Sequence, residues 1–172
     1  METIISFRKM EESDLKLLHQ WLNKDIVIEW YTKEPVTYEK VLEKYLPRVK
    51  GEKFVQCYFM LYNLKPIGYI QTYKIWDFPE YNKFVKANEG THGIDLFIGE
   101  GDYLHKGIGA TIISTFLKDI VFKNNKINKC IIGPDPNNKV AIRAYEKAGF
   151  KYIKTINTGD EIEYLMINYK NN

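Results

Sequence analysis

The chain has 172 residues, of which 45% are hydrophobic, and this length is typical of one domain. We expect a single domain over residues 1–172. The formal net charge of +3 is small and spread along the sequence, so it does not indicate nucleic-acid binding, and no nucleic-acid partner is expected.

The N-terminal segment and the cysteines bear on where the protein works. Residues 1–5 contain neither a basic cluster nor an apolar run that approaches the length of a signal or membrane-spanning helix, so we expect a cytoplasmic protein without a membrane partner. Cys57 and Cys130 lie in apolar, strand-like runs and are expected to be reduced core residues. A metal site is not expected, because no ligand spacing relates the three histidines, His19, His92 and His105.

The first fifty residues have the pattern of a strand followed by two helices. A short apolar run at 4–7 predicts an opening strand, and Ser13 is expected to cap the first helix. The predicted buried face of that helix comprises Leu15, Leu18, Trp21 and Leu22. A second helix is expected because apolar residues recur at one-turn spacing, at Val41, Leu42, Tyr45 and Leu46. Pro47 is expected close to the end of this helix.

The next segment predicts a hairpin and then a loop. Residues 54–62 are almost continuously apolar, as in a strand buried on both faces, and residues 67–73 are expected to return antiparallel to them. Between Trp76 and Glu89 aromatic and charged residues mix without a period. This segment is therefore expected to be a substrate loop or lid.

Strands and helices interleave in the last eighty residues. The sequence predicts strands at 92–98 and 128–132, a long helix after the Gly107-x-Gly109 turn, a helix at 137–147 ended by Gly149, and a last hairpin at 150–156 and 161–167. Together with the earlier elements, this order indicates an α/β fold with a mixed sheet.

The most informative local feature is a turn of small residues between a strand and a helix. Its residues are Lys106, Gly107, Ile108, Gly109 and Ala110. Backbone N–H groups lie uncovered at such a helix start, where an anion is stabilised, so the turn predicts a pyrophosphate cradle. The alternative is that the two glycines only ease a tight loop.

This turn and the run Asn138-x-x-Ala141-x-x-x-Tyr145, which continues to Phe150, resemble the GCN5-related N-acetyltransferases (GNAT), which bind acetyl-coenzyme A. Further stretches are similar to the aminoglycoside 6'-N-acetyltransferases, and they are residues 28–31, 43–47, 66–73 and 93–99. The resemblance covers almost the whole chain in the family's order, although siderophore-forming acyltransferases look similar across the same motifs.

The resemblance implies a GNAT fold, which is an α/β fold with a mixed, mostly antiparallel central sheet that is splayed between strands 4 and 5 and has flanking helices. It also implies that backbone N–H groups near Phe97 and Ile98 face the thioester of acetyl-coenzyme A. Residues 106–110 would hold its phosphates, with the Lys106 side chain as an added cation and His105 beside them. Asn138 would bind the cofactor arm through its amide, or alternatively cap its helix.

Two residues are expected to carry the chemistry. Tyr145 resembles the tyrosine that assists the departing thiolate, although an aromatic residue at this spacing can equally be core. Asp95 matches the family's aspartate beside the attacking amine. A carboxylate within an apolar strand needs a partner or a wet cavity, because an unpaired buried charge is costly. Asp95 could hold the substrate ammonium and take its proton, directly or through a water.

An aminoglycoside is a polycation, so further substrate contacts are expected from carboxylates and aromatic walls. The resemblance implies walls formed by Tyr31, Tyr45 and Gln71, with Trp30 adjoining them. Asp160 matches a second substrate aspartate, although a Gly-Asp pair is equally a turn signal. Relatives carry Asp-Pro after strand five, whereas here the aspartate, Asp135, is displaced by two residues. The sequence therefore does not decide whether Asp135 contacts the antibiotic.

The predicted function is a cytoplasmic aminoglycoside 6'-N-acetyltransferase that uses acetyl-coenzyme A without a metal and confers antibiotic resistance. A monomer or weak dimer is expected. One alternative is a related acyltransferase acting on a siderophore-type hydroxylamine or a polyamine. Another is a non-catalytic protein that binds an aminoglycoside or acetyl-coenzyme A without turnover.

Overall fold

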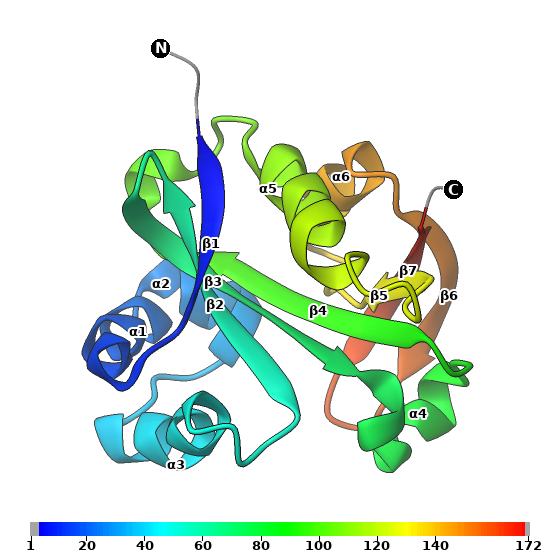
Figure 1. Cartoon of the computed structure of the whole chain (residues 1–172), viewed down its shortest axis with the longest axis horizontal. Coiled ribbons are helices and arrows are strands. Elements are labelled where there is room, and N and C mark those ends of the chain that lie inside the picture. The colour runs from blue at the N-terminus through cyan, green and yellow to red at the C-terminus, as the bar shows by residue number, and fades with distance from the viewer. Residues whose placement is uncertain (1–3, 171–172) are drawn as a thin grey trace. The chain divides into compact units, whose positions relative to one another are not determined.

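The computed structural model describes residues 4–170, so the first three residues of the N-terminal segment, for which no signal helix is expected, lie outside it. Its strands are β1 Ile5–Lys9, β2 Val55–Tyr62, β3 Lys65–Lys74, β4 Thr91–Ile98, β5 Lys129–Ile132, β6 Lys151–Asn157 and β7 Ile162–Tyr169. The helices are α1 Leu15–Leu22, α2 Asp25–Val27, α3 Tyr38–Val49, α4 Pro79–Val85, α5 Gly109–Phe116 and α6 Lys139–Lys147 (Figure 1).

The strands form a seven-stranded sheet in the order β1-β2-β3-β4-β5-β7-β6. The chain divides into two compact units, one of residues 1–71 and 95–105 and the other of residues 72–94 and 106–172. The single domain over residues 1–172 stays a prediction. No helix in the described part of the chain combines the length and hydropathy that crossing a bilayer requires.

The first unit contains α1, α2 and α3 together with β1, β2, β3 as far as Gln71, and the end of β4 from Asp95. β1 pairs antiparallel with β2, from Ile5 opposite Tyr62 to Lys9 opposite Tyr58. The predicted face of α1 is buried, and α1 packs against α3, which in turn packs against β2. The β2–β3 hairpin is also confirmed, with left-handed backbone at Asn63 and Leu64 (φ 48° and 68°), as in a two-residue hairpin turn.

Two details of this unit differ from the sequence prediction. Ser13 does not cap α1, because a 3-10 turn at Glu12–Asp14 precedes the helix. Asp14 accepts a bond from the Glu11 N–H at 2.7 Å in the capping box of that turn, and it forms an ion pair with the Arg8 guanidinium through bonds of 2.8 and 2.9 Å. Phe54 precedes β2 and is 80% exposed, so the buried strand begins one residue later than predicted.

The second unit contains the rest of the sheet with α4, α5 and α6. β5 pairs antiparallel with β7, and β7 with β6. β4 pairs with β5 in parallel, and this register ends at Gly93 opposite Ile131, whereas β4 continues to Ile98. This early end of the pairing is what a sheet splayed between its fourth and fifth strands requires, and the predicted mixed, mostly antiparallel α/β sheet is confirmed.

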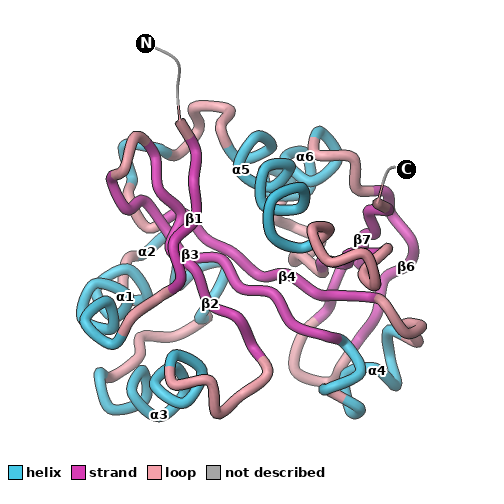
Figure 2. Tube along the Cα trace, in the orientation of Figure 1, coloured by secondary structure: helices cyan, strands magenta, loops and turns pink. Residues whose placement is uncertain are grey.

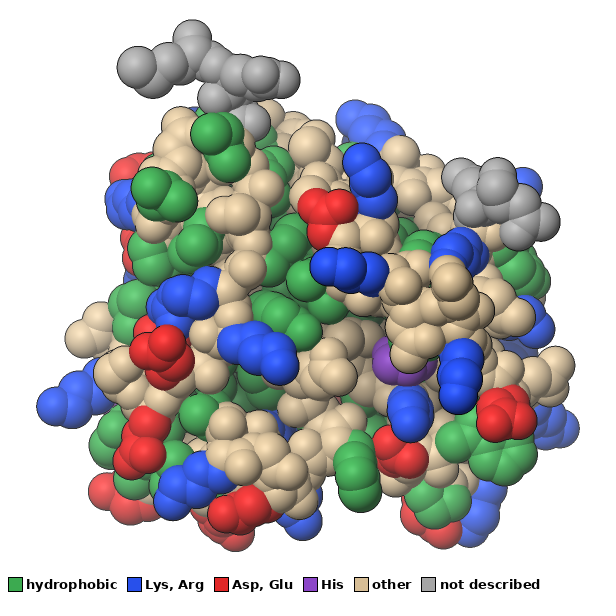
Figure 3. Space-filling view, in the orientation of Figure 1, with side chains coloured by type: hydrophobic (Ala, Val, Ile, Leu, Met, Phe, Trp, Pro, Cys, Tyr) green, Lys and Arg blue, Asp and Glu red, His purple; other side chains and the backbone are tan. Residues whose placement is uncertain are grey.

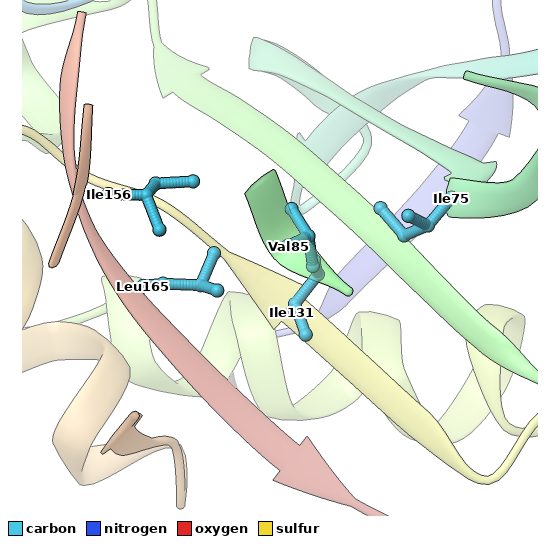
Figure 4. Packing of buried hydrophobic residues seen from close by; sticks show 5 residues of the cluster. All are labelled: Ile75, Val85, Ile131, Ile156 and Leu165. Atoms are coloured by element: carbon cyan, nitrogen blue, oxygen red, sulfur yellow. The ribbon is translucent and has the colours of Figure 1, made fainter. Parts of the chain in front are cut away.

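The prediction of a loop or lid between Trp76 and Glu89 is wrong. The segment contains a 3-10 turn and then α4, which begins with Pro79 in its first turn (Figure 2). Its last residue, Val85, belongs to the buried cluster drawn in Figure 4, which consists of Ile75, Val85, Ile131, Ile156 and Leu165. A helix of seven residues is too short to display a clear period in the sequence, but the packing of its end on β5 and β7 fixes it.

The surface carries both signs of charge. On the face in Figure 3, Lys and Arg side chains are interspersed with Asp and Glu. This distribution accords with the small formal net charge of +3.

His92 is a buried histidine of the second unit, and its hydrogen-bond partner is an uncharged side chain. His92 is 8% exposed, and its Nδ1 lies 3.2 Å from the Thr72 hydroxyl, which donates to the Gly93 carbonyl at 3.1 Å. Because that hydroxyl proton is already donated, Nδ1 is the donor to the Thr72 oxygen. Burial, reinforced by Lys74 and opposed by Asp77, lowers the pKa of His92 from 6.5 to about 4.

This pKa predicts a specific pH dependence of stability. The unfolded chain takes up a proton on His92 near pH 6.5 and the folded chain only near pH 4, so the free energy of unfolding should fall as the pH is lowered through this window. Urea unfolding at several pH values should show a shallower fall for His92→Gln than for the wild type. Identical slopes for the two proteins would contradict a buried neutral His92.

Candidate active site

The first unit brings Asp95 of β4 and Gln71 of β3 together. The Gln71 Nε2 donates to Asp95 Oδ2 at 2.7 Å. Gln71 is 7% exposed, whereas Asp95 is partly open to solvent. The carboxylate in an apolar strand therefore has the hydrogen-bond partner that its burial requires, and it retains exposed surface for a ligand.

Two residues that sequence reasoning missed complete this cluster. The Gln71 Oε1 accepts a bond from Arg48 Nη1 at 2.7 Å and another from the Tyr69 hydroxyl at 2.6 Å. Arg48 lies three residues after the predicted substrate residue Tyr45 on α3, and Tyr69 lies two residues before Gln71 on β3. Helical and strand periodicity place each pair on one face, and this spacing was the available signal.

Aromatic rings surround the polar cluster. The Tyr45 and Tyr69 ring centroids are 5.6 Å apart, Tyr69 stacks on Phe97 at 5.7 Å, and Tyr31 meets Phe97 edge-on at 4.8 Å. Within this unit the structure thus brings Tyr31, Tyr45 and Phe97 into one aromatic cluster, and Tyr69 joins that cluster to Gln71. Tyr45, Tyr69 and Phe97 are buried and Tyr31 is partly exposed, and the predicted roles of Tyr31 and Tyr45 as walls of the substrate site stay predictions.

The ionisable groups of this cluster are held in defined protonation states. Burial raises the pKa of Tyr45 to about 12 and the pKa values of Tyr31 and Tyr69 well above their usual range. These phenols are therefore neutral donors at physiological pH. Burial also raises the pKa of the Cys57 thiol, so Cys57 is not poised as a nucleophile.

Trp30 lies in a short π-helical turn, Ile28–Thr32, that follows α2. It is half-buried, and the Lys33 Nζ lies 5.7 Å from its ring centroid. Tyr31, the next residue, is the one that reaches Phe97. The predicted role of Trp30 at the substrate stays a prediction.

In the second unit, the small-residue turn leads into α5 through left-handed backbone. Gly107 has a φ of 73° and is exposed together with Lys106. His105, the last residue of the first unit, is also exposed and has a φ of 59°. Ile108 occupies the N-cap position and has no polar side-chain atom to satisfy the first N–H groups of α5. An exposed and uncapped helix start suits the phosphates of acetyl-coenzyme A.

The backbone conformation favours glycine at Gly107, whereas neither backbone nor packing requires glycine at Gly109. A Cβ at Gly107 would meet nothing within 4 Å, yet the left-handed backbone there disfavours any side chain. A Cβ at Gly109 would make an ordinary contact with the Ala144 Cβ at 3.5 Å, so packing of α5 on α6 does not require glycine. The open space over Gly107 fits the close approach of a pyrophosphate.

Helix α6 carries the other two predicted cofactor residues. Tyr145 is 7% exposed, and its ring meets Phe150 edge-on at 5.9 Å. The Asn138 Oδ1 accepts a bond from the Ala141 N–H at 3.1 Å, which is the capping role left open by the sequence. This bond uses the amide oxygen and leaves the amide NH2 outside the cap.

The two other predicted carboxylates lie in turns. The Asp135 Oδ1 accepts a bond from the Asn137 N–H at 2.8 Å, and Asp160 is exposed in the turn between β6 and β7. Neither is placed against an aromatic wall by the described contacts of its unit, and their substrate roles stay predictions.

Glu163 is a carboxylate that sequence reasoning missed. It lies on β7 beside Gly133, at the end of β5, and a Cβ at position 133 would overlap its carboxylate. The Tyr81 hydroxyl of α4 donates to Glu163 Oε2 at 2.6 Å. No local pattern in the sequence could reveal this arrangement, because it depends on β7 lying next to β5.

Within residues 4–170, no group of three or more His, Cys, Asp and Glu side chains is arranged to hold a metal ion. Cys57 and Cys130 are both free thiols and buried, as predicted.

Comparison with known proteins agrees with these features. Residues 10–158 match the model of the acetyltransferase (GNAT) domain. The chain is 34% identical over 158 residues to aminoglycoside N(6')-acetyltransferase type 1 of Klebsiella pneumoniae, covering 91% of this chain and 78% of the relative, and equally so to that of Serratia marcescens. It is 35% identical to the kanamycin resistance protein of Rhizobium radiobacter over 75 residues, which are 44% of this chain and 68% of that protein.

Solved structures are similar over nearly the whole chain. The structure of AAC(6')-Ib in complex with paromomycin and acetyl-coenzyme A superimposes with a TM-score of 0.88 at 32% identity, covering 96% of this chain and 93% of that one. A second structure, of AAC(6')-Ib with coenzyme A and kanamycin, gives a TM-score of 0.87 at 32% identity, with 97% and 95% covered.

The uncapped turn before α5 and the satisfied carboxylate of β4 are features of an acetyl-coenzyme A-dependent acyltransferase. The chain belongs to the acetyltransferase (GNAT) domain family.

The turn generates a test with a matched control. Gly107→Val should weaken acetyl-coenzyme A binding by about ten-fold or more, equivalent to about 1.4 kcal/mol, because a side chain there blocks the backbone from the pyrophosphate. Isothermal titration calorimetry with acetyl-coenzyme A measures the loss. Gly51→Val is the control, since Gly51 has a φ of 75° against 73° at Gly107 and is equally open. Equal affinities in the two folded variants would show that the turn is only a loop.

Proposed function

We propose that this protein is an aminoglycoside 6'-N-acetyltransferase that transfers the acetyl group of acetyl-coenzyme A directly to the 6'-amine of the antibiotic. The observation that carries the proposal is the Asp95 carboxylate, held at 2.7 Å by Gln71 in a unit whose aromatic cluster contains Tyr31 and Tyr45. The relatives named for aminoglycosides and for kanamycin resistance support the same substrate class.

Asp95 would bind the 6'-ammonium and accept its proton. A carboxylate has about four acceptor positions, so the bond from Gln71 leaves capacity for a substrate ammonium. Removal of the proton, directly or through a water, gives the neutral amine that attacks the thioester. Gln71 would keep the carboxylate oriented while this occurs.

Acetyl-coenzyme A would supply the acetyl group as a thioester. The backbone of residues 106–110 would hold its phosphates, with the Lys106 ammonium as an added cation and His105 beside it. The amide of Asn138 would contact the arm of the cofactor. Backbone N–H groups near Phe97 and Ile98 would donate to the thioester oxygen as negative charge develops on it.

Tyr145 would donate a hydrogen bond to the departing thiolate. A covalent acetyl-enzyme is not part of the proposal, because Cys57 is buried with a raised pKa. Trp30, Asp135 and Asp160 are proposed as outer contacts of the antibiotic. The protein would act as a monomer or weak dimer in the cytoplasm, where it would confer resistance without a nucleic-acid or membrane partner.

The alternatives predict different products. An acyltransferase for a hydroxylamine or a polyamine would release thiol with those acceptors and not with aminoglycosides. A non-catalytic binding protein would release none. Neither alternative is favoured by the relatives, and a thiol-release assay with acetyl-coenzyme A and a panel of acceptors separates all three.

Asp95 gives the sharpest prediction of this function. Asp95→Asn keeps an oxygen that can accept the bond from Gln71 but removes the charge, so kcat/KM for a 6'-amino aminoglycoside should fall by ~10²-fold or more. Acetyl-coenzyme A affinity measured by calorimetry should stay at the wild-type value. A variant with wild-type kcat/KM would exclude Asp95 as the group that binds and deprotonates the amine.

The position of acetylation is tested with neomycin and paromomycin, which carry an amine and a hydroxyl, respectively, at the 6' position. The wild-type protein should acetylate neomycin far faster, because a hydroxyl is neither a cation for Asp95 nor a comparable nucleophile. NMR of the product should place the new acetyl on the 6' nitrogen. Equal rates, or acetyl on another ring, would refute the 6' assignment.

Tyr145 is tested separately. Tyr145→Phe should lower kcat by about ten-fold or more, because the thiolate loses its hydrogen-bond donor, while the ring packing on Phe150 is kept. The affinity for the antibiotic should hardly change. If kcat remains within about two-fold of the wild type, Tyr145 serves packing and the thiolate departs without its help.

A further inference from the structure

We infer that Arg48 is a positioning residue for Asp95 and acts through the side-chain amide of Gln71. The inference rests on the proposed function, in which Asp95 binds the amine of the acceptor. Helix α3, which contains the proposed substrate residue Tyr45, would then have a second role, because its Arg48 donates the hydrogen bond that orients Gln71.

The chemistry of the guanidinium determines which way the Gln71 amide points. An amide has an acceptor end and a donor end, and rotation by a half turn exchanges them. Arg48 only donates, so the atom of Gln71 that lies 2.7 Å from Arg48 Nη1 is the carbonyl oxygen. The NH2 end must then face Asp95, where it donates to Oδ2 at 2.7 Å.

Tyr69 is compatible with the same orientation. Its hydroxyl donates to Gln71 Oε1 at 2.6 Å and lies 3.0 Å from the Cys57 Sγ. A hydroxyl can also accept, so Tyr69 does not decide which end of the amide faces it. Arg48 decides it, because a rotated amide would place its NH2 against a group that cannot accept and its carbonyl against a carboxylate.

Arg48 itself is fixed by packing. Its Cζ lies 5.2 Å from the centroid of the Tyr45 ring, and that ring meets Tyr69 edge-on. A cation close to a pocket for a polycation repels the substrate, so direct contact with the antibiotic does not explain an arginine here. A donor that cannot accept explains it, because only such a group excludes the wrong orientation of Gln71.

The test compares three variants of α3. In Arg48→Met, the amide is released and Asp95 is misplaced relative to the acetyl group, so kcat on a 6'-amino aminoglycoside should fall by about ten-fold while KM changes by less than about three-fold. Arg48→Lys keeps a donor-only cation and, because the observed bond uses one nitrogen, should recover kcat to within about three-fold of the wild type.

Lys44→Met is the matched control. The Lys44 Nζ lies 5.4 Å from the same Tyr45 ring, against 5.2 Å for the Arg48 Cζ, so this variant also removes a cation from that ring. It leaves the bond to Gln71 in place, and kcat should stay within about two-fold of the wild type. An equal loss of kcat in Arg48→Met and Lys44→Met would overturn the inference, because charge alone would then explain both.

A second readout does not depend on catalysis. In the NMR spectrum of the free protein, the Gln71 side-chain amide protons should lie downfield because of the bond to Asp95, and they should move upfield in Arg48→Met but not in Lys44→Met. If Arg48→Met does not fold, Arg48→Gln takes its place, because its amide can accept as well as donate and so no longer excludes the rotated Gln71. Unmoved amide signals in the folded Arg48 variant would overturn the inference. A wild-type protein that acetylates no aminoglycoside would instead refute the proposed function, with the NMR comparison still deciding the role of Arg48.

Discussion

The hydrogen bond from Gln71 Nε2 to Asp95 Oδ2 is the interaction on which the candidate site depends. It lets β4 carry a carboxylate between buried residues without leaving a charge unsatisfied, which would cost several kcal/mol. The bond is useful only if the amide keeps one orientation. Arg48 imposes that orientation, Tyr69 donates to the same amide oxygen, and the Tyr45 ring in turn holds Arg48.

The two ligands of the proposed reaction are recognised by different physical means. A polycationic acceptor calls for a side-chain carboxylate that is partly open to solvent, which the first unit provides at Asp95. A pyrophosphate calls for backbone N–H groups, which the second unit exposes at the start of α5, where glycine permits left-handed backbone and Ile108 supplies no cap. Side-chain sites depend on tertiary partners, whereas a backbone site depends mainly on a short local sequence.

This difference explains how much could be predicted. The order of strands and helices, the buried stripe of α1, the hairpins and the turn at residues 106–110 follow from local periodicity and from glycine, and the structure agrees with them. Asp95 was predicted because a carboxylate in an apolar strand is unusual in itself. The predicted role of Ser13 was wrong because Asp14, its neighbour, makes the local contacts with Glu11 and Arg8. The predicted loop at Trp76–Glu89 was wrong because Val85 packs on residues distant in sequence.

The sequence by itself determined the fold class, the family and the short motifs proposed to bind acetyl-coenzyme A, because each of these depends on residues that are close together in the chain. Only the tertiary structure decided what surrounds Asp95. Arg48 reaches Gln71 because α3 and β3 pack in the same unit, and Glu163 lies against Gly133 because β7 pairs with β5. These contacts join residues that are more than twenty positions apart. Periodicity along the chain predicts which side chains share a face of one element, and it does not predict which side chains of different elements meet.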